Sequence, residues 1–338
     1  MNRIVSADKP LDRSPEEWRP EDQSATAWSL NDIVSELRHS RESANKIRHR
    51  GEVRELPSRA AVGGIVDDLA AALFPTHYGR PDLSDDSIDF FVGDRLHNGL
   101  AALNEQVRRS LSLGREACHK AETLTATEAV QCAGEITAAF ARQLPAIRAL
   151  LVSDLMAAYN GDPAATSISE LLLCYPGITA IIHHRLAHAL QRLDAPFIAR
   201  LIASISQSAT GIDIHPAAQI DAGFFIDHGT GVVIGETAII GRNVRLYQAV
   251  TLGARKLPAD ETGALVKGGA RHPIIEDNVV IYAGATVLGR ITIGRDSVIG
   301  GNVWLTQSVP PGSIITRAKS SHGDMHLISL GLQDGSGI

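Results

Sequence analysis

Cysteine is scarce in this chain, and the few cysteines that occur show no paired spacing. The 338 residues include three of them, Cys118, Cys132 and Cys174. Disulfide-stabilised secreted domains carry cysteines in even sets, so this usage favours a reducing compartment, and we expect a cytoplasmic protein. Aromatic residues make up only 4% of the chain. No apolar run reaches the roughly 18 residues that a membrane span requires, so we expect no membrane association.

The chain also lacks an excess of positive charge and an apolar N-terminal segment. The formal net charge is −6 at pH 7, which argues against binding to the phosphate backbone of nucleic acids. The first 25 residues contain six acidic side chains and no apolar stretch, so they do not resemble a secretion signal. We predict a disordered arm over residues 1–25.

An aliphatic repeat of six residues runs through the C-terminal half. Helices give a period of about 3.6 residues and single strands a period of 2, so neither explains it. A sustained period of six is typical of a parallel β-helix, in which each hexad supplies one short strand and one turn. A second aliphatic line lies two residues further on, on the same side of each strand. The repeat comprises Ile214, Ile220, Ile226, Val232, Ala238, Val244 and Val250, then Ile275, Ile281, Val287, Ile293, Ile299 and Leu305.

We expect the register of this repeat to break once, between Leu252 and Ile275. The intervening segment is polar and rich in glycine, and it ends in Arg271, His272 and Pro273. Long loops within a compact repeat are usually functional. The sequence therefore predicts a loop extruded from the β-helix over residues 253–273.

The N-terminal half has the periodicity of helices. Apolar residues at helical spacing, with charges on the opposite face, predict an α-helical domain over residues 26–210. The fold class is α+β, with this domain followed by a β-helix over residues 211–312 and a tail over residues 313–338. The individual helices are expected at residues 59–74, 88–113, 127–159, 167–193 with a start or kink at Pro176, and 196–208.

Several charged side chains interrupt the apolar repeat and are candidates for chemistry. His228 follows Asp227 where a hexad normally has small or aliphatic residues. Because imidazole titrates near neutrality, His228 is a candidate general base. Asp213 precedes His228 by 15 residues, a little less than one coil, so we expect its carboxylate to approach and orient the imidazole. Arg271 offers a bidentate donor for a substrate carboxylate.

Six short segments together resemble serine O-acetyltransferase, a hexapeptide-repeat enzyme. The resemblance covers about residues 150 to 316, and Gly161-Asp-Pro-Ala164 matches an acidic substrate-contact segment upstream of the repeats. It implies a left-handed β-helix that transfers acetyl from acetyl-CoA to the L-serine hydroxyl, the first step of cysteine synthesis from serine. The segments are Asp213-Ile-His-Pro-Ala-Ala218, Ile226-Asp-His-Gly-Thr-Gly231, Val233-Ile-Gly-Glu-Thr237, Gln248-Ala-Val-Thr-Leu-Gly253, Arg271-His-Pro273 and Val309-Pro-Pro-Gly312.

The resemblance also implies roles for individual residues. His228 would take the proton of the serine hydroxyl, and Asp213 would orient it. Carboxylates would hold the serine ammonium group, and Arg271 with His272 would hold its carboxylate. The implied ammonium contacts are Asp162 and Asp227, and the implied CoA contacts are Gly253, Ala283, Arg317 and Lys319.

The same resemblance implies ligands and partners. L-cysteine, nearly isosteric with serine, would be a feedback inhibitor. The assembly would be a homotrimer or a dimer of trimers, with sites between neighbouring subunits. The chain ends in Ile338 after acidic and glycine residues, as do family members whose tail enters O-acetylserine sulfhydrylase.

Three alternatives remain open. The chain would otherwise be a hexapeptide acetyltransferase for another hydroxyl or amine, or a non-catalytic partner of the sulfhydrylase. The third is a zinc site made between subunits by His215, His228 and His272, as in the β-helical carbonic anhydrases, which resemble this chain only in fold. Their closely spaced histidine pair on one coil is missing here, so we expect no metal. The histidines at positions 183, 184 and 188 lie on a predicted helix, where i, i+4 spacing allows metal binding, but no further ligand is evident, and we interpret them as helix-packing or surface residues.

Overall fold

The computed structural model describes residues 29–44, 56–117, 125–255 and 268–316. The chain divides into two units, residues 1–54 and residues 55–338. In the first unit, α1 (Leu30–His39) leads into a short π-helical turn at Ser40–Ala44. The predicted arm over residues 1–25 lies outside the described residues, as do Arg317, Lys319 and the tail that ends at Ile338. No helix in the described ranges is long and apolar enough to cross a membrane.

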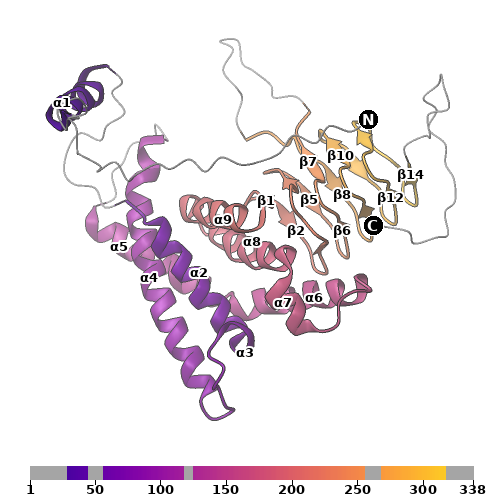
Figure 1. Ribbon diagram of the computed structural model, residues 1–338, viewed down its shortest axis with the longest axis horizontal. Helices are drawn as coiled ribbons and strands as arrows, with labels where there is room; N and C mark the ends of the chain where they lie inside the picture. The colour runs from indigo at the N-terminus through magenta and orange to yellow at the C-terminus, as the bar shows by residue number, and fades with distance from the viewer. Residues whose placement is uncertain (1–28, 45–55, 118–124, 256–267, 317–338) are drawn as a thin grey trace, which may run out of the picture. The chain divides into compact units, whose positions relative to one another are not determined.

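The second unit contains short parallel strands stacked in successive coils (Figure 1). Each strand pairs with strands one coil away, which gives three sheets in the orders β1-β4-β7-β10-β13, β11-β8-β5-β2 and β14-β12-β9-β6-β3. This is the predicted parallel β-helix. The strands are β1 (Asp213–Ile214), β2 (Gln219–Ile220), β3 (Phe225–Ile226), β4 (Val233–Ile234), β5 (Ile239–Ile240), β6 (Arg245–Leu246), β7 (Thr251–Gly253), β8 (Ile274–Ile275), β9 (Val280–Ile281), β10 (Thr286–Leu288), β11 (Thr292–Ile293), β12 (Val298–Ile299), β13 (Trp304–Leu305) and β14 (Ile314–Ile315).

Both aliphatic lines of the repeat are buried, as the period predicted. All thirteen residues of the first line are at most 9% exposed. In the second line, Ile234, Ile240, Leu246 and Leu252 are at most 2% exposed. Successive hexads therefore direct their apolar side chains into one continuous core inside the coils.

The expectation of a single break in register is wrong. Ile214 pairs with Ile234, and Ile226 with Leu246, a separation of 20 residues, whereas Ile234 pairs with Leu252, a separation of 18. Two extra residues thus lie in the turn between β3 and β4. The sequence conceals this insertion because both lines are aliphatic, so a count of six passes from one line to the other without a visible gap.

The helical region of the second unit agrees with the predicted pattern except that α3 was not predicted and one predicted helix is divided near Pro145. The expected helix over residues 127–159 is two helices. Pro145 lies in the first turn of the second one, a position that favours proline, so the chain begins a new helix there. Within residues 167–193 a separate helix begins at Pro176, where the sequence predicted a start or kink. The helices are α2 (Arg59–Leu73), α3 (Pro75–Tyr78), α4 (Ile88–Ala117), α5 (Ala126–Ala141), α6 (Leu144–Gly161), α7 (Ile168–Cys174), α8 (Pro176–Arg192) and α9 (Pro196–Thr210).

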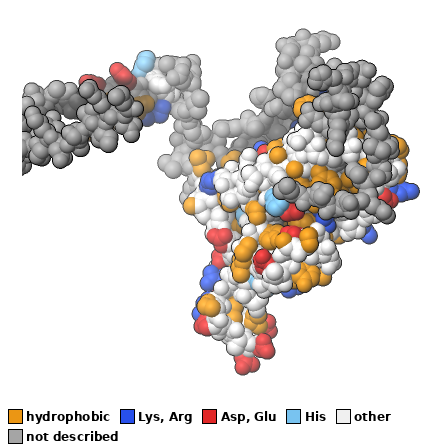
Figure 2. Space-filling view, turned by 45° about the vertical axis from the view of Figure 1, so that its right-hand side comes forward, with side chains coloured by type: hydrophobic (Ala, Val, Ile, Leu, Met, Phe, Trp, Pro, Cys, Tyr) orange, Lys and Arg blue, Asp and Glu red, His pale blue; other side chains and the backbone are white. Residues whose placement is uncertain are grey.

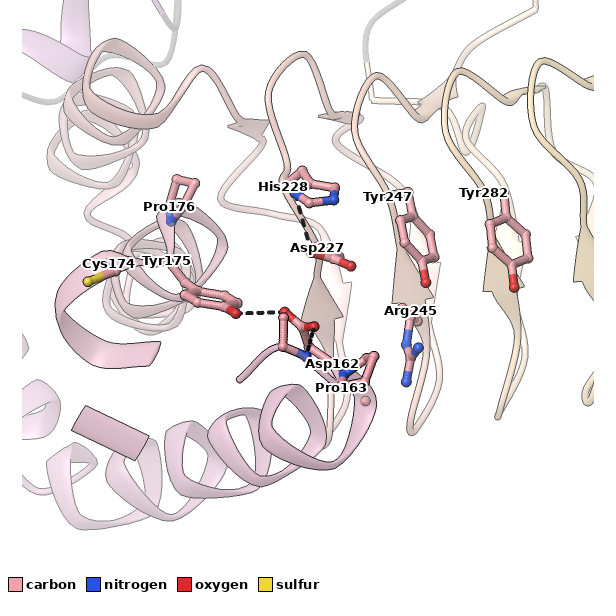
Figure 3. Close-up of a pocket in the computed structure, with 12 residues that line it drawn as sticks. Asp162, Pro163, Cys174, Tyr175, Pro176, Asp227, His228, Arg245, Tyr247 and Tyr282 are labelled. Carbon is pink, nitrogen blue, oxygen red and sulfur yellow. Dashed lines mark hydrogen bonds and ion pairs between the residues drawn. The ribbon is translucent and has the colours of Figure 1, made fainter. Parts of the chain in front are cut away.

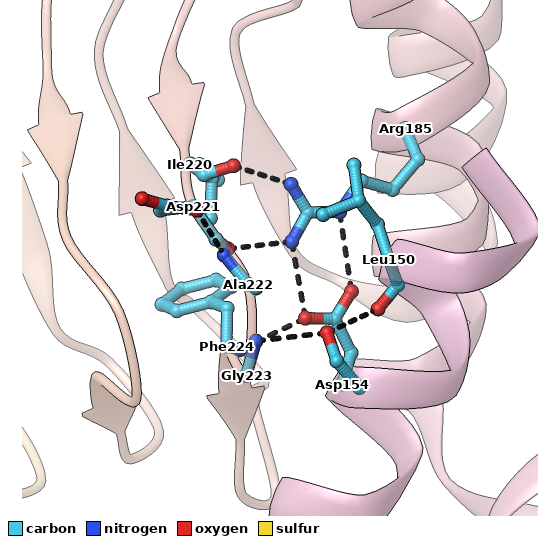
Figure 4. Close-up of polar contacts among 9 residues, drawn as sticks. Leu150, Asp154, Arg185, Ile220, Asp221, Ala222, Gly223 and Phe224 are labelled. Carbon is cyan, nitrogen blue, oxygen red and sulfur yellow. Dashed lines mark hydrogen bonds and ion pairs between the residues drawn. The ribbon is translucent and has the colours of Figure 1, made fainter. Parts of the chain in front are cut away.

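Two of these helices are joined to the first coil by a buried ion pair (Figure 4). Arg185 of α8 donates to both carboxylate oxygens of Asp154 on α6, at 3.1 and 3.0 Å. The guanidinium also donates to the carbonyl oxygens of Ile220 and Asp221. The backbone N–H of Phe224 donates to Asp154 Oδ1 at 2.9 Å. Through these hydrogen bonds the ion pair holds α6 and α8 against the segment that leads into β3.

The β-helix continues past Gly312, where the sequence predicted that the tail begins. β14 pairs with β12 in the register Val298 to Ile314 and Ile299 to Ile315. The other boundaries of the predicted division, between arm and helical domain at residue 25 and between helical domain and β-helix at residue 210, stay predictions.

We expect Asp154→Ala to lower the free energy of unfolding by about 3–5 kcal/mol, because it leaves the Arg185 charge buried and unpaired. Denaturant unfolding monitored by circular dichroism measures the change. Asp82→Ala is the control. It breaks an exposed ion pair with Arg80, in the turn between α3 and α4, where acidic side chains gather at the lower end of Figure 2. The control change should stay below about 1 kcal/mol. Equal effects of both substitutions would contradict the buried clamp.

Candidate functional site

A cavity of about 700 Å³ lies where α6, α7 and α8 meet the turns of the β-helix. Figure 3 shows acidic and aromatic side chains around it, with His228, Tyr247 and Tyr282 on successive coils. The cavity brings together three of the predicted site residues. The lining residues are Gly161, Asp162, Pro163, Ala164, Cys174, Tyr175, Pro176, Asp227, His228, Arg245, Tyr247 and Tyr282.

Asp162 ends α6 and is held from two sides. The Tyr175 hydroxyl donates to Asp162 Oδ2 at 2.6 Å, and the backbone N–H of Ala164 donates to Oδ1 at 2.8 Å. The bond to Asp162, followed by burial, raises the pKa of the Tyr175 phenol above its ordinary value. Tyr175 therefore remains a donor that fixes the orientation of this carboxylate.

Asp227 and His228 follow β3 in the turn that contains the two extra residues. We call residues 227–232 the His228 turn. His228 adopts a left-handed backbone conformation, with φ of 57°, and its side chain is 61% exposed. Its Nδ1 lies 3.7 Å from Asp227 Oδ1. The insertion thus lifts the imidazole off the coil and places it at the wall of the cavity.

Asp227 shares the cavity with the carboxylate of Asp162. Burial raises the pKa of Asp227, and the nearby charge of Asp162 raises it further, while His228 opposes this effect. Two carboxylates that share a partly dry cavity are best satisfied by a bound cation. The site is therefore suited to an ammonium group lying between Asp162 and Asp227, within reach of His228.

Arg271 and His272 lie at the other end of β4. We call residues 235–238, together with residues 268–273, the Arg271 turn. Arg271 donates to Glu236 Oε2 through Nη2 and to the carbonyl oxygen of Gly269 through Nη1. The backbone N–H groups of Arg271 and His272 both donate to Thr237 Oγ1, at 2.9 and 3.1 Å. The loop predicted from the break in register thus returns to the coil at Thr237. Its residues 256–267 lie outside the described part of the chain.

Within one chain, β4 separates the His228 turn from the Arg271 turn. β4 begins after residue 232 of the first turn and ends before residue 235 of the second. Extended chain rises about 3.3 Å per residue, so these two residues lie about 10 Å apart. Neither Arg271 nor His272 lines the cavity beside His228. The chain therefore presents two half-sites, one acidic and one basic, at different corners of the coil.

The other predicted residues lie at one or the other of these corners. Gly253 ends β7 on the side of the Arg271 turn, and Ala283 precedes β10 on the side of the His228 turn. Asp213 begins β1. Among the described residues no hydrogen bond or ion pair joins it to His228, whose imidazole instead pairs with Asp227. The predicted pairing of Asp213 with His228 stays a prediction.

The histidines considered as zinc ligands do not converge within one chain. The backbone N–H of His215 donates to the carbonyl oxygen of Ile234 at 2.9 Å, at the end of β4 that leads into the Arg271 turn, whereas His228 precedes β4 at its other end. Among the described residues, no group of three or more histidine, cysteine or acidic side chains is arranged to hold a metal ion. On α8, His184 is 4% exposed, which fits a packing role for this residue.

Sequence reasoning missed several residues of the cavity. Tyr247 and Tyr282 stack with ring centroids 4.9 Å apart and line it beside His228. Arg245 lies over Phe225 and against Gly161, where a Cβ would come within 2.2 Å of the guanidinium. One signal was available, since the residues numbered 245 and 247 bracket the inward Leu246 and must point outward from the coil.

Comparison with known proteins agrees with this geometry. The family described as bacterial transferase hexapeptide (six repeats) matches residues 272–307. The plasmid serine acetyltransferase of Synechococcus elongatus is 58% identical over 299 residues, which cover 87% of this chain and 92% of that protein. Serine acetyltransferase isoform 3 of Entamoeba histolytica, solved with cysteine, aligns with a TM-score of 0.63 at 34% identity and covers 87% of this chain and 95% of that chain. Native serine acetyltransferase 1 of the same organism aligns with a TM-score of 0.64 at 32% identity and covers 85% and 98%.

The coil of hexads and its two half-sites define an acyltransferase of the left-handed β-helix class. The match to the Synechococcus protein, at 58% identity over 87% of this chain, identifies the family within this class. The chain belongs to the serine acetyltransferase family.

We expect Asp227→Asn to raise the free energy of unfolding at neutral pH. A folded-state pKa above the unfolded value means that the folded protein disfavours the ionised carboxylate. Stability is therefore lost as pH rises through that interval, and the neutral amide removes the cost. Thermal unfolding of the two proteins at pH 7 measures the difference, with the exposed Asp85→Asn as control. A lower melting temperature for Asp227→Asn would contradict the inferred cost of ionising the buried carboxylate.

Proposed function

We propose that this protein transfers the acetyl group of acetyl-CoA to the hydroxyl of L-serine and releases O-acetyl-L-serine and CoA. The observation that carries the proposal is the convergence of Asp162 and Asp227 beside His228 in one cavity. An α-amino acid with a reactive side-chain oxygen matches it, because its ammonium group pairs with the carboxylates while its hydroxyl reaches the imidazole. This reaction begins cysteine synthesis from serine.

His228 acts as the general base. It accepts the hydroxyl proton as the serine oxygen attacks the thioester carbonyl carbon, and the resulting tetrahedral intermediate collapses by breaking the C–S bond. The imidazolium then returns the proton to the CoA sulfur, so the enzyme ends the cycle unchanged. The His228 ring is free to do this because most of its surface is exposed to the cavity. Asp213 contributes by orienting it.

Arg271 and His272 bind the serine carboxylate from a neighbouring subunit. The separation of the two turns within one chain supports this arrangement, since the basic half-site of one copy must meet the acidic half-site of another. A cyclic homotrimer, alone or paired as a dimer of trimers, brings equivalent corners together in this way. CoA then lies along the coil between Gly253 and Ala283, with its phosphates near Arg317 and Lys319. No metal takes part.

We infer further partners from the family. L-cysteine inhibits by occupying the serine site, as the cysteine complex of the Entamoeba isoform suggests. The C-terminal Ile338 inserts into O-acetylserine sulfhydrylase, and the enzyme works in the cytoplasm. Each of these assignments is part of the proposal.

His228→Ala should lower kcat for serine acetylation by about 10²–10⁴-fold while leaving the KM for acetyl-CoA within about twofold. The rate of CoA thiol release in the presence of L-serine measures both constants. His97→Ala, an exposed histidine of α4, serves as the control and should behave like wild type. Unchanged kcat in His228→Ala would remove this base. Thiol release that depends on a sugar or another amine in place of serine would reassign the acceptor.

L-cysteine should raise the apparent KM for L-serine without changing kcat, because its thiol replaces the serine hydroxyl in the same contacts. Initial rates over a matrix of serine and cysteine concentrations test this. Asp162→Asn should weaken the binding of serine and the binding of cysteine by similar factors, since both amino acids present the same ammonium group. Inhibition that excess serine fails to overcome would contradict a shared site.

A further inference from the structure

Thr237 lies at the centre of the Arg271 turn and makes four hydrogen bonds with its neighbours there. Its hydroxyl oxygen accepts the backbone N–H groups of Arg271 and His272, at 2.9 and 3.1 Å. The same oxygen lies 2.9 Å from Nδ1 of His272, and the backbone N–H of Thr237 donates to that nitrogen at 3.0 Å. One residue therefore determines both the path of the returning loop and the surroundings of one imidazole nitrogen.

These contacts determine where the proton of His272 resides. The Thr237 hydroxyl accepts two N–H groups, which uses both of its lone pairs, so its own hydrogen points to the remaining acceptor, Nδ1 of His272. The backbone N–H of Thr237 points to the same atom. A proton on Nδ1 would face two donors, so the neutral ring carries its proton on Nε2.

The His272 ring also packs against the backbone of Gly235. An added Cβ at Gly235 would lie 2.0 Å from Cδ2 and 2.1 Å from Nε2 of His272, so the imidazole edge rests directly on this glycine. His272 is 7% exposed. No hydrogen bond among the described residues uses its Nε2, and this atom is not fully buried. Nε2–H is thus left for a ligand.

We propose that Thr237 is a positioning residue that fixes His272 as the Nε2–H tautomer, which makes His272 a hydrogen-bond donor to an anionic oxygen of the substrate. The identity of that oxygen as the serine carboxylate rests on the proposed function, whereas the tautomer does not. In this assignment His272 takes no proton during the reaction. The division of labour follows directly, because His228 removes the proton and His272 only donates a hydrogen bond.

Burial and the net effect of the surrounding charges favour the neutral form of His272. Burial, followed by the positive charge of Arg271, lowers the pKa of His272 to about 4, with Glu236 opposing and His215 and Arg290 adding to the decrease. Arg290 also donates to the carbonyl oxygens of Thr237 and His272, at 2.7 and 3.0 Å, and so ties the two residues together.

Nitrogen-15 NMR of histidine-labelled full-length protein without substrate tests the tautomer directly, with His272→Gln to assign the ring signals. In wild type we expect a protonated Nε2 and an unprotonated Nδ1 that do not titrate between about pH 5 and 8. Thr237→Val removes one donor to Nδ1 and should move both shifts toward each other, and Thr237→Ser should restore them. A protonated Nδ1 in wild type would overturn the proposal.

Kinetics supplies the second readout. Thr237→Val should raise the serine KM about tenfold, as expected for a weakened bond to a charged group, with the KM for acetyl-CoA nearly unchanged. Thr237→Ser should return the serine KM to within about twofold. Thr292→Val, the same exchange on β11, is the control and should match wild type. Unchanged His272 shifts and serine KM in Thr237→Val would refute the role. A wild type that fails to acetylate serine would refute the proposed function but not the tautomer.

Discussion

The hydrogen-bonded stacking of one coil on the next is the constraint on which this molecule depends. Each strand is paired in parallel register with strands one coil away, and the apolar side chains of every hexad fill the interior. A residue is therefore assigned to a corner of the coil by its place in the count, and it cannot change corners without breaking a column of backbone bonds. This rigidity holds the His228 turn and the Arg271 turn apart within one chain.

The proposed site residues lie where the count of six fails. Two extra residues between β3 and β4 push His228 outward, and the long insertion after β7 returns as Arg271 and His272. A third contribution comes from outside the coil, since α6 carries Asp162 to the cavity. The buried pair of Asp154 and Arg185 holds that helix against the segment before β3. Scaffold and insertions thus divide the work, with stability in the regular positions and chemistry in the exceptions.

Periodicity was sufficient to predict the β-helix and its inward residues, because these depend on spacing along the chain. It failed where an insertion preserved the pattern, at the step from Ile226 to Ile234, and where a proline reset a helix, at Pro145. Candidate site residues that place charge among the apolar repeats, such as Asp227 and His228, were visible in the sequence. Partners such as Tyr175 for Asp162, or Thr237 for His272, were not. Their pairing is created by the folded path of the chain, and nothing in local spacing marks it.

The central claim is that one active site uses the His228 turn of one copy and the Arg271 turn of another. Co-expression of two inactive variants, His228→Ala and Arg271→Ala, tests it most directly. If the site forms between subunits, mixed assemblies contain sites with both residues intact, and random mixing should restore about one quarter of wild-type acetylation per chain. If both residues serve a site within one chain, every site in the mixture lacks one of them, and the activity will remain at the level of the separate variants.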